Sequence, residues 1–275
     1  MKKFCIISIA ICLMTTAAFA ASNRTSEEYL KNKKHFSILN PFAENCAEKI
    51  IKKALKKEVG NGHYKVKFEC YTVSSLKKGI FKTLNIQGKK LLIDNIPVKS
   101  LNLNTQTDYN WIDFKASPIK VKSDIIFDYN LELSEESLNQ ALEDKDYQKI
   151  INKINLKAYP LFELKDVKIK IKNDRIYLII DYILPLNPNR KNRAFIVSSE
   201  FKVENGKIKA KNVHIDKSYG NLPLDKVANL INLLDPLTFT LNVLKEDNCQ
   251  GKVENVMIKD NNIQINGKIF IKKGE

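Results

Sequence analysis

Sequence signatures of catalysis are scarce in this chain. It contains no G-x-S-x-G elbow, no phosphate-binding loop, no H-E-x-x-H pair and no protein-kinase signature. Its three histidines, His35, His63 and His214, stand far apart in the sequence. We therefore expect a protein that is not an enzyme and holds no cofactor. A hydrolase with a dispersed site is the alternative, and it would need His63 or His214 to meet acidic side chains in a cleft.

Metal and redox motifs are also missing. Beyond residue 20 the cysteines are Cys46, Cys70 and Cys249, with no C-x-x-C pair and no Cys/His cluster. This spacing excludes a zinc or thioredoxin-type motif, and no metal site is expected. Three cysteines in an oxidising compartment allow one disulfide and one remaining thiol. The sequence leaves the pairing open.

Glycine and proline are few, at 9 and 8 residues of 275, which argues against long disordered tracts.

Acidic residues are outnumbered by basic ones, because the chain has 46 Lys and Arg but 31 Asp and Glu, for a net charge of +15. Such a surplus is typical of proteins with anionic partners, such as lipid head groups, acidic polymers or nucleic acid. The lysines are spread along the chain, so an AT-rich coding bias is the simpler explanation. No nucleic-acid-binding signature accompanies the charge, and we expect no nucleic-acid partner.

The first twenty residues have the order of a secretory signal peptide. Lys2 and Lys3 precede an apolar run from Phe4 to Met14, and the segment ends in Ala18-Phe19-Ala20. The run is shorter than the roughly 20 apolar residues that a spanning helix needs. This pattern predicts export of the protein across the inner membrane.

Cleavage is expected after Ala20, giving a periplasmic or secreted protein. Residues 1–20 are then the signal peptide, residues 21–39 a loosely held N-terminal arm, and residues 40–275 a single lipid-binding-like domain. An uncleaved anchor is the alternative. A lipoprotein is disfavoured, because Cys12 follows Ile11 where such processing prefers a small residue.

A basic amphipathic helix is predicted from Asn40, with Asn40 as its N-cap and Pro41 at the first helical position. One face is apolar and the other carries lysines. The two faces consist of Ala43, Ala47, Ile50, Ile51, Ala54 and Leu55, and of Lys49, Lys52, Lys53, Lys56 and Lys57. Such a helix can lie on a membrane, but we expect its apolar face to pack on a sheet.

Beyond Gly60 the hydrophobic period changes from 3.6 to 2, which predicts β-strands. Alternation covers residues 66–72 and 101–107, and its longest run extends from Ile119 to Leu133. As a single strand these residues would span roughly 50 Å. Strands of this length are typical of sheets that curl.

The second half of the chain repeats the order of helix and strands. Ser134 is predicted to cap a helix, and a break near residues 144–146 indicates two helices or a kink. The later elements are strands at 167–171 and 176–184, a hairpin turning at Asn205-Gly206, a helix around 227–234 and a C-terminal hairpin. Short connections without β-α-β alternation predict the α+β class, with antiparallel sheets that carry amphipathic helices on one face. If the long curved sheet does not close, its concave face and a helix would border an apolar groove.

An acyl chain is the ligand that such a groove would take, because each buried CH₂ contributes roughly 0.8 kcal/mol. We expect a phospholipid or other acyl-chain ligand, held for lipid transfer or envelope maintenance. Candidate lipid-binding residues, chosen by face and size, are Ile50, Leu55, Phe68, Ile125, Phe127, Leu138, Leu142, Phe195 and Phe201. The alternative is a dry core, in a cell-envelope scaffold or adhesion module without a ligand.

Two basic loops are candidates for contact with an anionic membrane surface. The first surrounds Gly79 and comprises Leu76, Lys77, Lys78, Ile80, Phe81 and Lys82. If exposed, Ile80 and Phe81 would enter the bilayer edge while the lysines meet head groups. If buried, these two residues belong to the core. The second loop, residues 189–193, has a similar basic character.

These residues also carry a family resemblance. The motif Leu76-x-x-Gly79-x-Phe81-x-x-Leu84-x-Ile86-x-Gly88 follows an amphipathic helix and an alternating strand. The later segment 133–142 is similar to a helix start written L-T-E-x-D-L-N-x-x-L. With these features, residues 43–215 resemble the LmeA-like bacterial phospholipid-binding family, formerly a domain of unknown function.

The resemblance implies an envelope protein that binds phospholipid and supports lipid or glycan assembly. It also implies a curved antiparallel sheet around a long helix, as in the tubular lipid-binding proteins, and it supplies no catalytic residue. The matching positions Gly79, Phe81, Gly88, Leu138 and Asn139 are expected to mark structure more than a site.

Overall fold

The computed structural model describes residues 39–93, 96–113, 116, 120–160, 162–186, 193–217 and 249–274. The predicted signal peptide, nearly all of the arm, the helix around 227–234 and residues 189–192 of the second basic loop lie outside these residues. Within them the protein is α+β with antiparallel sheets, as predicted. No helix among them is both long and apolar enough to cross a membrane.

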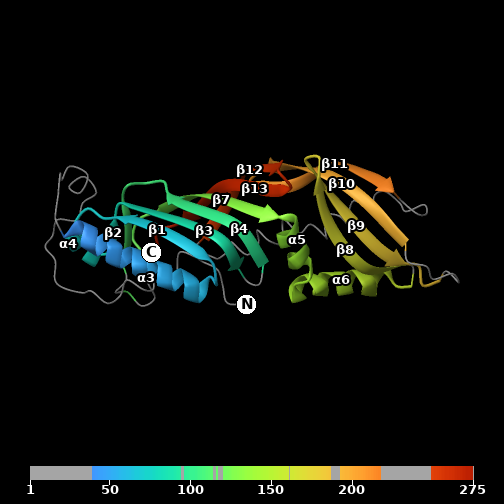
Figure 1. Ribbon diagram of the computed structural model, residues 1–275, viewed down its shortest axis with the longest axis horizontal. Coiled ribbons are helices and arrows are strands. Elements are labelled where there is room, and N and C mark those ends of the chain that lie inside the picture. The colour runs from blue at the N-terminus through green and yellow to red at the C-terminus, as the bar shows by residue number, and fades with distance from the viewer. Residues whose placement is uncertain are drawn as a thin grey trace.

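The first sheet has six antiparallel strands in the order β1-β3-β4-β7-β13-β12 (Figure 1). Its strands are β1 (His63–Glu69), β3 (Thr83–Ile93), β4 (Ile96–Thr105), β7 (Ile125–Ser134), β12 (Cys249–Lys259) and β13 (Asn262–Ile271). Helix α3 (Asn40–Glu58) packs against β1, and its residues Ala47, Ile51, Ala54 and Leu55 are buried. The apolar face of α3 therefore packs on a sheet, as the sequence predicts, and its five lysines are exposed.

The second sheet has four antiparallel strands in the order β11-β10-β9-β8. These are β8 (Glu163–Lys172), β9 (Arg175–Ile183), β10 (Arg193–Glu204) and β11 (Lys207–Lys217). Helices α5 (Glu135–Leu142) and α6 (Lys145–Ala158) lie along its β8 side (Figure 1). A small third sheet joins β2 (Ile80–Phe81), β5 (Asn110–Asp113) and β6 (Lys120–Val121), and α4 (Val73–Lys77) precedes β2.

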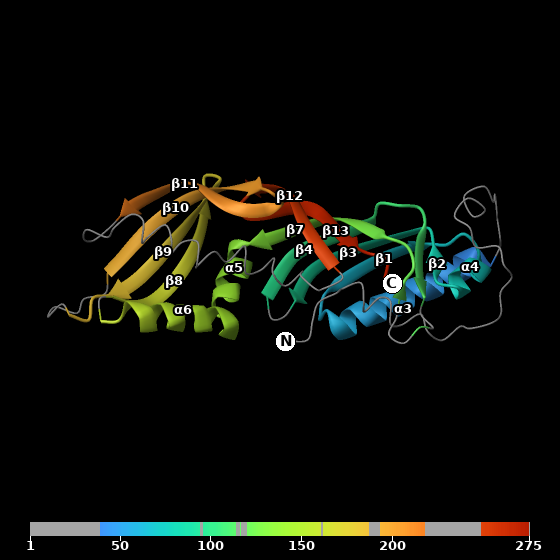
Figure 2. The same ribbon diagram turned by 180° about the vertical axis from the view of Figure 1, so that it is seen from behind.

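The two large sheets follow one another along an elongated molecule (Figures 1 and 2). Helix α5 contacts β4 and β7 of the first sheet and β8 of the second. The β10–β11 turn meets β12, where the Val253 N–H donates to the Gly206 carbonyl at 3.2 Å. One cluster of buried apolar side chains includes residues of both sheets, so the core continues through the junction.

Local turn and cap signals are confirmed in the second half. The Ser134 hydroxyl accepts from the Ser137 N–H, and α5 and α6 are separate helices divided at residues 143–144. Asn205 and Gly206 both have positive φ in the β10–β11 turn, where asparagine and glycine are favoured.

Two local predictions are wrong. Asn40 is not the N-cap of its helix, because Leu39 occupies that position without a side-chain cap, while the Asn40 amide donates to the Tyr71 carbonyl at 3.0 Å. The predicted strand from Ile119 to Leu133 is also interrupted. The N–H groups of Lys122 and Ser123 both donate to the Trp111 carbonyl, which holds β6 on β5 and leaves β7 to begin at Ile125.

Candidate functional site beside the edge of the second sheet

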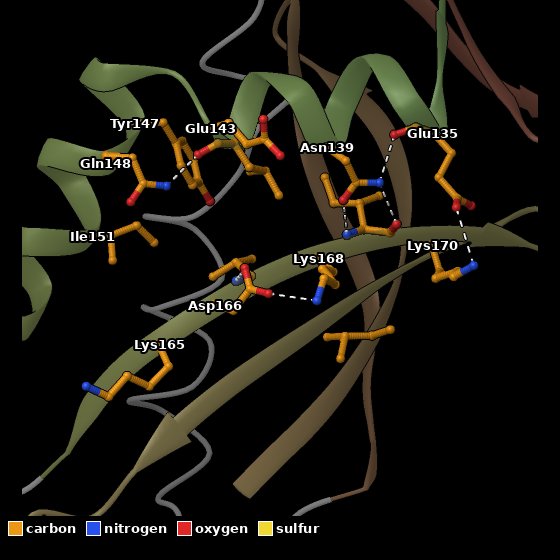
Figure 3. A pocket seen from close by; sticks show the side chains of 14 residues that line it. Glu135, Asn139, Glu143, Tyr147, Gln148, Ile151, Lys165, Asp166, Lys168 and Lys170 are labelled. Atoms are coloured by element: carbon orange, nitrogen blue, oxygen red, sulfur yellow. Dashed lines mark hydrogen bonds and ion pairs between the residues drawn. The ribbon is translucent and has the colours of Figure 1, made fainter. Parts of the chain in front are cut away.

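A cavity of about 360 Å³ lies between α5, the start of α6 and strand β8 (Figure 3). Its apolar lining consists of Leu142, Tyr147, Ile151, Val167, Ile169 and Ile179. Its polar lining consists of Glu135, Asn139, Glu143, Gln148, Lys165, Asp166, Lys168 and Lys170. The volume is within the usual range for small-molecule sites, which is roughly 300–1,000 Å³.

Strand β8 is an edge strand, and α5 satisfies part of its free backbone edge. The Asn139 side chain accepts from the Ile169 N–H at 2.8 Å and donates to the Ile169 carbonyl at 2.9 Å. One turn earlier, the Glu135 carboxylate accepts from the Ile171 N–H at 2.8 Å. These contacts replace a neighbouring strand and fix α5 beside β8.

Helix α6 satisfies the other end of the same edge. The Asn155 side chain accepts from the Leu164 N–H at 2.7 Å and donates to the Leu164 carbonyl at 3.0 Å. Between the contacts of Asn139 and Asn155, the register of β8 on β9 shifts between Leu164 and Asp166. The Val167 N–H donates to the side-chain carboxylate of the preceding residue, Asp166, at 2.9 Å. The cavity occupies this interval, so it exists because the helices contact β8 at two separate places.

The charged groups around the cavity are balanced and largely paired. The Lys168 Nζ lies 2.8 Å from Asp166 Oδ2, and the Lys170 Nζ lies 3.6 Å from Glu135 Oε1 (Figure 3). The hydrogen bond to Asp166 raises the pKa of Lys168. Among the described residues, the Glu143 carboxylate has no hydrogen bond or ion pair. The lining therefore offers three carboxylates and three ammonium groups around an apolar floor.

Replacing Asn139 with leucine should lower the free energy of unfolding by about 2 kcal/mol. The substitution leaves the Ile169 N–H and carbonyl without their side-chain partners, and an unsatisfied backbone group costs roughly 1–3 kcal/mol. Urea denaturation followed by circular dichroism measures the change. Gln140→Leu on the exposed face of α5 is the matched control, and an equal loss there would show that the effect does not come from the β8 edge.

The nine predicted lipid-binding residues do not gather in this cavity. Seven of them are fully buried in the core: Leu55, Phe68, Ile125, Phe127, Leu138, Leu142 and Phe195. Ile50 and Phe201 are half-buried. Leu142 is the member of this set that lines the cavity.

The first basic loop is folded into the core at its apolar residues. Ile80 and Phe81 are both 1% exposed, so the prediction that they reach a bilayer is wrong. They form β2, which pairs with β5, and the Phe81 ring lies 5.4 Å from that of Phe68. Around them Leu76 and Lys78 are half-buried, whereas Lys77 and Lys82 are exposed. Lys82 lies 3.4 Å from Glu69.

Among the described residues, no disulfide joins Cys46, Cys70 and Cys249 to one another. Cys46 is exposed, whereas Cys70 and Cys249 are buried. Burial, reinforced by the Glu44 carboxylate, raises the pKa of Cys70 to about 12, so its thiol stays protonated at neutral pH. Among the described residues, no three His, Cys, Asp or Glu side chains gather closely enough to hold a metal ion. His63 lies on β1 and His214 on β11, and neither lines the cavity.

Sequence reasoning missed the charged lining of the cavity. Lys165, Asp166, Lys168 and Lys170 belong to an alternating strand, where charged residues are ordinarily solvent contacts. The sequence motif at residues 133–142 indicates only a structural role for Asn139. Its pairing with β8 depends on strand order, which no local pattern contains. Comparison of the chain with protein-family models, curated proteins and solved structures finds no match.

Proposed function

We propose that this protein binds a phospholipid or another acyl-chain amphiphile outside the inner membrane. The observation that carries the proposal is the cavity beside β8, which combines an apolar floor with a mouth of charged side chains. The predicted signal peptide supports a location outside the inner membrane. Lipid exchange with a membrane or envelope maintenance is the role that follows.

The apolar floor suits the acyl part of such a ligand. Tyr147, Ile151 and Val167 are all buried there. Each CH₂ group moved from water onto this floor contributes roughly 0.8 kcal/mol. A cavity of about 360 Å³ holds a segment of acyl chain and leaves the remainder near the opening.

The charged mouth suits a head group that carries both signs. Lys165, Lys168 and Lys170 offer donors to a phosphate, and the carboxylate of Glu143 offers an acceptor to an ammonium group. Because the lining has equal numbers of acidic and basic side chains, it favours a zwitterionic amphiphile over one with a large net charge.

Native mass spectrometry of the protein expressed from Ala21, with lipid analysis of what co-purifies, tests the proposal. Glu143→Trp places a large ring at the mouth without removing a core contact, and it should reduce co-purified lipid about tenfold. Glu136→Trp, on the exposed face of α5, is the matched control and should retain the lipid. A wild-type protein that carries no lipid and takes none from phosphatidylethanolamine-containing vesicles would overturn the proposal.

A second candidate function is an envelope scaffold without a ligand. It is favoured by the burial of seven of the nine predicted groove residues, since these side chains fill a dry core. The same mass measurement separates the two candidates, because a scaffold would show the mass of the polypeptide alone both before and after incubation with lipid.

A further inference from the structure

Three large hydrophobic side chains are exposed at the end of the second sheet. Leu156 and Tyr159, at the end of α6, are 81% and 66% exposed, and Leu186, just beyond β9, is 70% exposed. Soluble surfaces commonly carry single exposed apolar residues, but a group of large ones marks an interaction site.

Strand pairing brings these residues to the same end of the molecule. Glu163 at the start of β8 pairs with Ile183 at the end of β9, and Asn155 of α6 bonds to Leu164. The chain leaves α6 and β9 at this end, farthest from α4 (Figures 1 and 2). Leu156, Tyr159 and Leu186 are defined here as the terminal patch.

The terminal patch is accompanied by basic side chains of α6. Lys153 and Lys157 are exposed and lie within one turn of Leu156. In the part of the chain that the structure describes, neither ammonium group forms an ion pair. The opposite side of α6 is buried through Tyr147 and Ile151, so the helix is anchored in the fold while its outer side presents leucine and lysines.

We infer that the terminal patch docks end-on to an anionic phospholipid bilayer. Leu156 and Leu186 would enter the acyl boundary, and Tyr159 would lie at the head-group level, where amphipathic rings are favoured. Lys153 and Lys157 would meet anionic head groups, which attract basic residues placed beside an apolar surface. This combination of protruding apolar groups and unpaired cations matches a bilayer surface better than it matches a second protein.

Docking of the terminal patch goes beyond ligand binding in the cavity and does not require it. The patch is formed by the far end of α6, whereas the cavity is lined by the beginning of that helix. Failure of one proposal therefore leaves the other intact. Glu143→Trp should remove lipid from the cavity but still dock to bilayers. A variant of the terminal patch should lose docking but keep lipid in the cavity.

Vesicle co-sedimentation is the test, using phosphatidylcholine vesicles with and without phosphatidylglycerol. The triple variant Leu156→Ser/Tyr159→Ser/Leu186→Ser should bind mixed vesicles at least about tenfold more weakly. Lys153→Gln/Lys157→Gln should lose roughly fivefold per lysine, and only on vesicles that contain phosphatidylglycerol. Because all five side chains are exposed or lie in turns, these variants should fold, and urea denaturation verifies this.

The other end of the molecule supplies a matched control. Leu39 and Phe42, at the start of α3, are 65% and 72% exposed, and Leu39→Ser/Phe42→Ser should leave vesicle binding unchanged. Equal losses at both ends, or a folded triple variant that binds like the wild type, would overturn the assignment. Absence of vesicle binding together with concentration-dependent self-association would also overturn it, in favour of an interface between copies.

Discussion

Gly267→Ala is expected to destabilise the protein by about 3 kcal/mol, at the upper end of the usual cost of overpacking. Gly267 lies in β13, between Val253 of β12 and Tyr129 of β7. A Cβ atom there would stand 2.1 Å from the Lys252 carbonyl oxygen and 2.8 Å from the Tyr129 ring and hydroxyl. The first of these neighbours is backbone, so relief requires movement of β12 and not merely a change of rotamer.

Thermal and urea denaturation of Gly267→Ala measure this loss. Gly251→Ala in β12 is the matched control, because a Cβ atom there has no neighbour within 4 Å, and its stability should stay within about 0.5 kcal/mol of the wild type. If Gly267→Ala were as stable as the control, the Tyr129 ring and the β12 edge could not lie as closely on β13 as the structure places them.

Signals contained within a few residues were predictable from the sequence. The cap at Ser134 and the turn at Asn205-Gly206 depend on local backbone chemistry, and both were predicted at the positions where they occur. The apolar face of α3 was also predicted, because its period is a property of one helix. From these pieces the α+β class and antiparallel pairing followed.

Features that depend on partners distant in sequence were not predictable. The run from Ile119 to Leu133 alternates in sequence without interruption. The N–H groups of Lys122 and Ser123 nevertheless donate to the Trp111 carbonyl, and these hydrogen bonds end the strand there. Ile80 and Phe81 occur among lysines, yet pairing with β5 draws them into the core. In both cases a long-range backbone pairing overrides a correctly identified local pattern.

The same limitation concealed a structural parallel between the two halves. In the first sheet the carboxylates of Glu44 and Glu48 accept from the N–H groups of Cys70 and Phe68, at 2.9 and 3.0 Å. In the second sheet Glu135 and Asn139 accept from Ile171 and Ile169. Each pair is spaced i, i+4 on a helix and accepts from positions j and j−2 along an edge strand, with Cys70 directly following the end of β1.

This parallel explains why two halves without a visible repeat adopt similar arrangements. In each, a helix precedes an antiparallel meander and protects the free edge of its first strand. Protecting the edge in this way requires one side-chain hydrogen-bond acceptor at each of two helix positions. The side-chain oxygens of Glu and Asn can both serve as that acceptor. Because either residue type serves and the bonded partner is backbone, the relation leaves no repeated sequence motif.

Phe127→Ala is expected to lower the free energy of unfolding by about 4 kcal/mol, as for other fully buried aromatic side chains. Phe127 is 1% exposed on β7, between Thr105 of β4 and Ile269 of β13. Its ring belongs to the buried apolar cluster of the core, whereas the sequence pattern predicts a place for it in a lipid groove. Urea denaturation provides the measurement, and Phe42→Ala, at a 72% exposed position, is the control that should change stability by less than about 0.5 kcal/mol.

The lipid content of the Phe127→Ala protein distinguishes a core residue from a ligand contact. If Phe127 belongs to the core, the fraction that remains folded should carry as much lipid per molecule as the wild type, because the cavity beside β8 is lined by other residues. If Phe127→Ala kept full stability but lost its lipid, this assignment would be contradicted. The lipid would then have to contact the apolar face of the first sheet. The two measurements together therefore decide whether the apolar face of β7 stabilises the fold or binds an acyl chain.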